Sequence, residues 1–151
     1  MAKPVRYFED FKPGEVIELG SRSISKESII AFAKEFDPQV FHLDEEAAKQ
    51  TIYGGLLASG WHTGSLMMRL LWDGLLKDTI SLGSPGIDEM RWVRPVRPGD
   101  TLSARLTVLE CIPSRSKRDR GIIKSLVELR NQRGEVVVTI KGLSLLGRRP
   151  A

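Results

Sequence analysis

The sequence is poor in the residues that build disulfides and metal clusters. It holds one cysteine, Cys111, and two histidines among 151 residues. One cysteine cannot form an internal disulfide, and this set cannot supply a cysteine-based zinc cluster. The chain also lacks a nucleophile elbow of the Gly-x-Ser-x-Gly type and a phosphate-binding P-loop. We therefore expect no metal site, and a cytoplasmic protein kept in a reducing compartment.

Long apolar runs are absent as well. The uncharged stretch Gln50–Met68 is nearly long enough to cross a bilayer, but it contains four glycines and several polar side chains. Met1–Asp10 lacks the apolar segment of a signal peptide. We therefore expect no association with a membrane.

Neither sign of charge is in large excess. The chain has 23 Lys and Arg against 19 Asp and Glu, a formal net charge of +4. This mild excess favours anionic partners, but without a nucleic-acid-binding motif it does not indicate a partner of that class. Length and composition, with 41% apolar and 28% charged residues, predict a single domain over residues 1–151.

Two short helices are predicted in the first third of the chain. Ser25 is placed to cap a helix over Lys26–Phe36, and the Asp-Pro pair that follows should end it. Asp44 can cap a second helix over Glu45–Gln50. The stretch between them, through His42, is predicted to be irregular.

The segment Leu56–Lys77 is apolar on nearly every face, which is typical of a buried helix. It would be about 33 Å long if wholly helical. Gly60 and Gly64 weaken its first turns, so its ordered start can fall after Leu56. Its large side chains are expected in the core: Trp61, Met67, Met68 and Trp72.

The rest of the chain alternates with the period of β-strands. Thr101–Glu110 shows the clearest apolar and polar alternation. A turn at Asn131–Gly134 should join two further strands into a hairpin. Helix and strands together predict an α+β fold with one long helix against an antiparallel sheet, whose free edges favour a homo-oligomer. The other expected strands are Glu15–Leu19, which a turn at Gly20-Ser21 should end, Gly86–Arg94, Ile123–Arg130 and Glu135–Leu146.

Asp37 and His42 bracket a loop directly after the first helix. A carboxylate and an imidazole held close together can position a water molecule and accept its proton. The spacing alone leaves another interpretation open, in which Asp37 is a turn residue and His42 a packed loop histidine.

A glycine-rich run over Tyr53–His62 precedes and opens the long helix. Glycine permits close approach of a ligand to the backbone, and the first N–H groups of a helix have no partner within it. Such groups suit a developing oxyanion. In the alternative interpretation, the glycines only allow tight packing of helix on sheet.

These segments, followed by Arg94–Leu102, resemble the MaoC-like dehydratases, a hot-dog-fold family that includes the (R)-specific enoyl-CoA hydratases. The family signature is Asp-x-Asn-Pro-x-His-x-Asp, a glycine at the helix start, and a Pro-Val-x-x-Gly-Asp-x-Leu turn. The resemblance places Asp37 and His42 on the catalytic pair, Asp44 on the trailing aspartate and Gly60 on the oxyanion glycine.

The resemblance implies a hot-dog fold, with the long helix wrapped by the sheet, and a homodimer or larger homo-oligomer. It also implies reversible hydration of a trans-2-enoyl thioester to a 3-hydroxyacyl thioester, on coenzyme A or an acyl carrier. No protein-bound cofactor is needed. Asp37 and His42 would activate one water, and the N–H of Gly60 would stabilise the thioester oxygen.

The sequence departs from the family signature at four positions. Gln39 and Val40 replace the signature Asn and Pro, and Ser59 replaces a histidine common before the helix glycine. Met68 stands where some hydratases place a serine that binds the aspartate. Two alternatives therefore stay open: a hot-dog thioesterase, for which the helix offers only Asp73 as an acid, and a non-catalytic acyl-thioester-binding protein.

Five further residues are expected to bind substrate. Gly55, Trp61 and His62 lie beside the expected oxyanion glycine in sequence. Arg115 and Lys117 lie in a basic loop that suits the phosphates of coenzyme A or of a carrier. The alternative interpretations are a structural His62 and a solvated basic loop.

Overall fold

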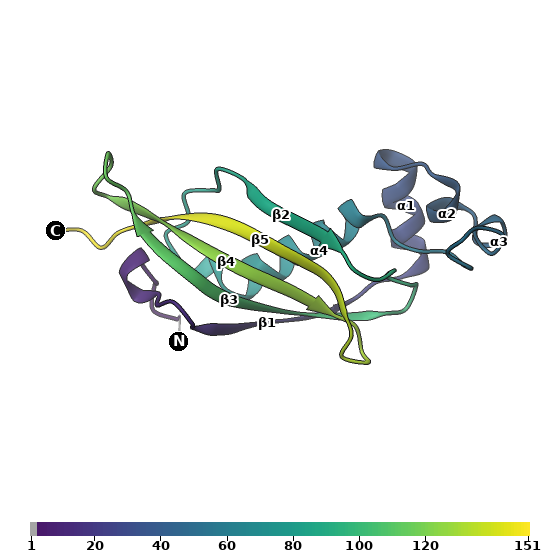
Figure 1. Ribbon diagram of the computed structural model, residues 1–151, viewed down its shortest axis with the longest axis horizontal. Helices are drawn as coiled ribbons and strands as arrows, with labels where there is room; N and C mark the ends of the chain where they lie inside the picture. Colours follow the sequence, from purple (N-terminus) through teal and green to yellow (C-terminus); the bar gives the residue numbers. More distant parts are fainter. Residues whose placement is uncertain (1–2) are drawn as a thin grey trace.

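The computed structural model describes residues 3–151 and shows one antiparallel sheet curved around a central helix, α4 (Figure 1). The strand order is β1-β3-β4-β5-β2, so β1 and β2 are the two edges. This α+β arrangement confirms the predicted fold class. The strands are β1 Val16–Ser23, β2 Ile87–Trp92, β3 Thr101–Pro113, β4 Arg120–Arg130 and β5 Val136–Gly147.

Alternating side chains of the central strands form the core. In β3 the buried positions are Leu102, Ala104, Leu106 and Val108, and β4 alternates in the same way. These side chains face α4 (Gly60–Gly74), whose Leu70 is buried. The period-2 signal in the sequence therefore predicted both the strands and their buried face.

The helices begin where their caps predict. The side chain of Ser25 accepts a hydrogen bond from the backbone N–H of Ser28, and α1 spans Lys26–Phe36. Asp44 caps α3, which spans only Glu45–Ala48. The stretch predicted to be irregular contains one helical turn, α2, over Val40–Leu43.

The long helix is shorter than its apolar stretch. Ser59 caps α4, which starts at Gly60, because the residues before it, 51–58, form turns and an irregular loop. The helix ends at Gly74, and a 3₁₀ turn over Leu76–Asp78 follows. Within residues 3–151 no helix combines the length and hydrophobicity needed to span a bilayer.

One predicted turn is part of a strand. Gly20 and Ser21 lie within β1, where the pairing with β3 shifts register between Glu18 and Gly20. Gly20 has a φ of 93°, a conformation that glycine adopts without strain. The Gly-Ser pair therefore forms a bulge and does not end the strand.

The prediction that α4 is buried on every side is wrong for this chain alone. Met67 is buried, but Trp61, Met68 and Trp72 are 62%, 46% and 46% exposed. Their spacing places them on one side of the helix. Trp61 contacts Trp92 of the edge strand β2, with 5.5 Å between ring centroids. This side of α4 and the β2 edge therefore share one apolar surface, the α4/β2 face.

Two glycines of α4 should respond differently to alanine. A Cβ at Gly74 would lie 2.7 Å from the backbone of Leu19, whereas a Cβ at Gly64 would meet only the flexible end of Met90. We expect Gly74→Ala to lower the free energy of unfolding by about 1–3 kcal/mol. Gly64→Ala should stay within about 1 kcal/mol of wild type. Chemical denaturation measures both, and equal effects would contradict this packing.

Candidate functional site

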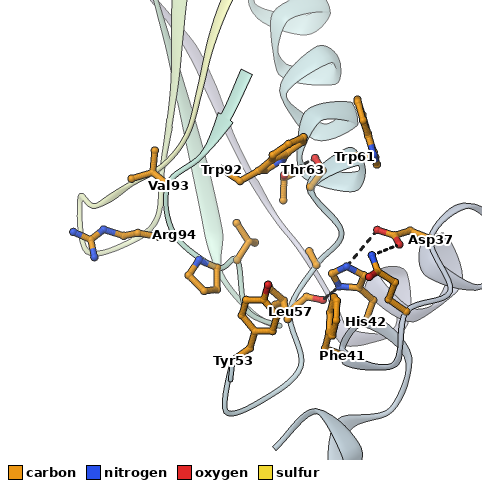
Figure 2. Close-up of a pocket in the computed structure, with 15 residues that line it drawn as sticks. Asp37, Phe41, His42, Tyr53, Leu57, Trp61, Thr63, Trp92, Val93 and Arg94 are labelled. Carbon is orange, nitrogen blue, oxygen red and sulfur yellow. Dashed lines mark hydrogen bonds and ion pairs between the residues drawn. The ribbon is translucent and has the colours of Figure 1, made fainter. Parts of the chain in front are cut away.

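Helices α1, α2 and α3 project beyond one end of the sheet (Figure 1). A cleft of about 490 Å³ opens there, and Figure 2 shows the residues that line it. Three chain segments form it: the end of α1 with α2, the residues that lead into α4, and the loop after β2. The cleft is lined by Asp37, Gln39, Phe41, His42, Tyr53, Leu57, Ala58, Gly60, Trp61, Thr63, Trp92, Val93, Arg94, Pro95 and Val96.

Asp37 and His42 meet in this cleft. Asp37 is the C-cap of α1, where the following proline stops the helix, and α2 turns the chain back so that His42 faces it. Oδ2 of Asp37 lies 3.3 Å from Nε2 of His42, as Figure 2 shows. The imidazole is almost wholly buried and the carboxylate mostly so. The structure therefore brings the sequence-predicted pair together.

The tautomer of His42 follows from its second nitrogen. Nδ1 lies 2.7 Å from the backbone carbonyl oxygen of Leu57. A carbonyl can only accept, so Nδ1 carries the hydrogen and donates it. In the neutral ring, Nε2 is then an unprotonated acceptor that faces Asp37. The pair thus presents two acceptors side by side.

The Asp37 carboxylate is held by two donors. Gln39 Nε2 donates to Oδ1 at 2.8 Å, and Ser59 Oγ donates to Oδ2 at 2.7 Å. Partial burial raises the pKa of Asp37, but these hydrogen bonds and the charge of His42 lower it by more. The pKa of Asp37 therefore lies below its ordinary value, and the group is a carboxylate at neutral pH.

Ser59 is a site residue that the sequence reasoning did not identify. It is fully buried, caps α4 and binds Asp37 with the same hydroxyl. The contact joins positions far apart in sequence, and an N-cap serine before a glycine was the only local signal. Met68, where the resemblance places an aspartate-binding serine, is exposed on α4 outside the cleft. Gln39 supplies the amide that the signature asparagine would supply.

Gly60 is the first residue of α4 and lines the cleft together with Asp37 and His42. As the first residue of the helix, it has a backbone N–H with no partner inside the helix. A Cβ at Gly60 would collide with the indole ring of Trp92, so a larger residue at this position would displace that ring. Trp61, the next residue, lines the same cleft.

Two predicted substrate-binding residues lie outside the cleft lining. Gly55 is in the loop before α4, and its carbonyl accepts a hydrogen bond from Arg97. His62 is buried and stacked on Phe32, with ring centroids 4.8 Å apart. Burial lowers the pKa of His62, and its Nδ1 has no hydrogen-bond partner among residues 3–151. This packing fits the structural interpretation of His62.

The basic loop lies at the opposite end of the sheet. Arg115 and Lys117 are in the turn between β3 and β4. Trp92 of the cleft pairs with Val138 of β5, which pairs with Leu129 of β4. From Leu129 to Arg120, next to the basic loop, β4 is about 30 Å long. The structure therefore does not bring this loop to the cleft of the same chain. The cation that lines the cleft is Arg94.

No group of three potential metal ligands occurs among the residues that the structure describes. The cleft offers one carboxylate and one imidazole, and both are already held by protein hydrogen bonds. Its chemistry is that of a proton acceptor pair beside a helix N-terminus.

Comparisons with known proteins identify the relatives of this chain. Residues 10–129 match the family described as MaoC like domain. An uncharacterized protein of Bacillus subtilis is 36% identical over 141 residues, 88% of this chain and 97% of its own. An (R)-specific enoyl-CoA hydratase of Rhodospirillum rubrum is 31% identical over 117 residues, 74% of this chain and 75% of its own.

Solved structures show the same fold. The crystal structure of a MaoC-like dehydratase from Rhodospirillum rubrum superposes with a TM-score of 0.87 at 43% identity, covering 97% of this chain and 99% of that one. The sheet wrapped around α4 is thus a hot-dog fold. From the matched family, the aligned relatives and the shared fold, the chain belongs to the MaoC-like dehydratase family.

Proposed function

We propose that this protein catalyses the reversible hydration of a trans-2-enoyl thioester to a 3-hydroxyacyl thioester. The observation that carries the proposal is the acceptor pair of Asp37 and His42, 3.3 Å apart in a cleft that also contains the first N–H of α4. The (R)-specific enoyl-CoA hydratase among the relatives supports the reaction class.

The acceptor pair suits one water molecule. A water can donate one hydrogen to Nε2 of His42 and the other to the Asp37 carboxylate, which leaves an oxygen lone pair free to attack. As the oxygen bonds to the β-carbon, His42 accepts a proton, and the adjacent carboxylate stabilises the resulting imidazolium. The same proton then passes to the α-carbon, which completes the addition of water.

The thioester oxygen gains negative charge between these two steps. The N–H of Gly60 would donate to this oxygen, and the positive end of α4 would add to the stabilisation. Removal of one such donor in other enzymes costs about 3–4 kcal/mol. The thioester itself activates the double bond, so the proposed reaction uses no protein-bound cofactor.

A thioesterase is less well supported. Asp73, the only acid in α4, forms an exposed ion pair with Arg69 at 2.9 Å and does not line the cleft. A non-catalytic acyl-thioester-binding protein would not require an aspartate held by two donors beside an unprotonated imidazole nitrogen. Binding of enoyl-CoA without turnover would favour that alternative.

Asp37→Asn should lower kcat for enoyl-CoA hydration by about 100-fold or more, because an amide can neither accept a water proton nor stabilise the imidazolium. The loss of enoyl-thioester absorbance measures the rate, and circular dichroism checks the fold. Asp73→Asn is the matched control and should keep the wild-type rate. Near-normal turnover of Asp37→Asn would show that the carboxylate does not support proton transfer to His42, and it would contradict this mechanism.

Arg94 is the cleft cation that can reach the phosphates of coenzyme A or of a carrier arm. It is half exposed and only loosely paired with Glu135, at 3.7 Å. Arg94→Glu should raise KM several-fold with kcat unchanged, the pattern of lost uniform binding. Added salt should shrink the effect. If Arg115→Glu raised KM several-fold and Arg94→Glu did not, the phosphates would be bound by the basic loop.

We also propose that a second copy covers the α4/β2 face. The exposed side chains of this face, Trp61, Met68 and Trp72, border an edge strand with unpaired backbone groups. A second copy related by a two-fold axis beside β2 would cover these side chains and the strand edge at once. Light scattering should give twice the 16.9 kDa chain mass. Met68→Glu should yield monomers, whereas Leu109→Glu, equally exposed on β3, should not. A wild-type monomer at micromolar concentration contradicts this assembly.

A further inference from the structure

Arg97 connects two loops that are distant in the sequence. It lies between β2 and β3, and its guanidinium donates to three backbone carbonyls of the segment before α4. Nη1 donates to Gly55 at 2.9 Å and to Leu56 at 3.3 Å, and Nη2 donates to Tyr53. One side chain therefore holds most of the carbonyls of the Tyr53–Leu56 segment.

The charge of Arg97 is directed at these carbonyls alone. Within residues 3–151 no carboxylate lies within 4.0 Å of its guanidinium. A planar fork with five donors suits several acceptors in fixed directions, which an ammonium group matches less well. The arrangement is that of a clamp on the backbone.

The backbone around Arg97 is itself fixed by hydrogen bonds. The backbone N–H of Arg97 donates to Oδ2 of Asp100. Asp100 is almost fully buried, and its Oδ1 accepts a hydrogen bond from Gln132 Nε2. Next to it, the N–H of Ala58 donates to the carbonyl of Val96 at 2.9 Å. The two loops are therefore joined by side-chain and backbone bonds.

The carbonyl that follows the clamped segment is that of Leu57, and it accepts the hydrogen from Nδ1 of His42 at 2.7 Å. Arg97 does not line the cleft, and its hydrogen bonds go to carbonyls other than the one that His42 binds. Its effect on the imidazole passes through the direction of this one carbonyl.

We propose that Arg97 is a positioning residue that fixes the tautomer of His42 by holding the Leu57 carbonyl in place. The proposal rests on the proposed function, because hydration uses the lone pair on Nε2. It goes beyond that function in assigning a role to a residue outside the cleft.

Two acceptors compete for the single ring hydrogen of neutral His42. The Leu57 carbonyl binds it on Nδ1, whereas the Asp37 carboxylate, 3.3 Å from Nε2, would bind it on the other nitrogen. With the hydrogen on Nε2, the ring donates to Asp37 and cannot accept a proton from water. Loss of the clamp would leave the carbonyls of Tyr53, Gly55 and Leu56 to find new partners. The Leu57 peptide would then be held only by its backbone bonds, from the N–H of Leu57 to Phe41 at 3.1 Å and from the N–H of Ala58 to Val96 at 2.9 Å.

The direct test is nitrogen-15 NMR of the imidazoles at a pH where both rings are neutral. The chain has only two histidines, so the spectrum of His62→Phe shows which signals belong to His42. The wild type should show a protonated Nδ1 and a bare Nε2 on His42. Arg97→Ala should shift the ring toward the Nε2-protonated form. Arg97→Lys should shift it in the same direction by less, and it keeps the test open if the alanine variant does not fold.

Kinetics give the second readout. Arg97→Ala should lower kcat about 10- to 100-fold, and it should change KM by less, since the clamped segment contributes only Tyr53 to the cleft lining. Millimolar guanidinium should restore part of kcat, and equimolar urea should not. Arg105→Ala is the matched control, since Arg105 pairs with Glu18 on the sheet surface, and it should change neither readout.

The outcomes separate this inference from the proposed function. An unchanged His42 tautomer in both Arg97 variants overturns the inference, even if kcat falls. If the Arg97 variants shift the tautomer but the wild-type protein hydrates no enoyl thioester, the positioning role is supported and the proposed function is overturned instead.

Discussion

The packing of α4 against the concave face of the sheet is the contact on which the rest of the molecule depends. Leu70, Leu102 and Leu129 belong to one continuous buried cluster. Each such side chain contributes about 1.5–3 kcal/mol, whereas exposed ion pairs at the surface contribute about 0–1 kcal/mol. This packing fixes the helix axis, so that the first turn of α4 emerges at the end of the sheet that α1, α2 and α3 overhang.

The site is built where regular structure ends. Asp37 caps α1, His42 lies in a single helical turn, Ser59 caps α4, and Arg97 lies in the loop after β2. None of these residues contributes to the sheet. The scaffold supplies a fixed helix N-terminus, and the loops supply acceptors and donors directed at it. Loop residues can therefore differ between relatives while the helix and sheet stay the same.

Local signals predicted local structure. Ser25 and the proline after Asp37 set the ends of α1 because caps and proline act within one turn. The Gly20-Ser21 pair predicts a turn, but glycine suits a bulge equally well, and only the pairing with β3 distinguishes the two. The exposed side of α4 could not be foreseen, since an apolar helix face has the same sequence pattern whether the fold buries it or leaves it exposed.

The candidate site was predicted only where its residues are marked by local sequence signals. Asp37 and His42 were found because they are close in sequence and match a family signature. Ser59 and Arg97 act through contacts that cross more than one element, which no spacing rule describes. The distance of the Arg115 loop from the cleft of the same chain could not be foreseen, because composition does not tell which end of a sheet a hairpin reaches.

The edge-to-face contact of Trp61 and Trp92 has an optical consequence. The two indoles lie 5.5 Å apart at the rim of the cleft, and one of them also faces outward from α4. Rings this close couple their electronic transitions, so the pair should give a near-ultraviolet dichroism signal of its own. The protein thus carries a built-in chromophore whose spectrum responds to any movement between the helix and the edge strand, without a dye or a label.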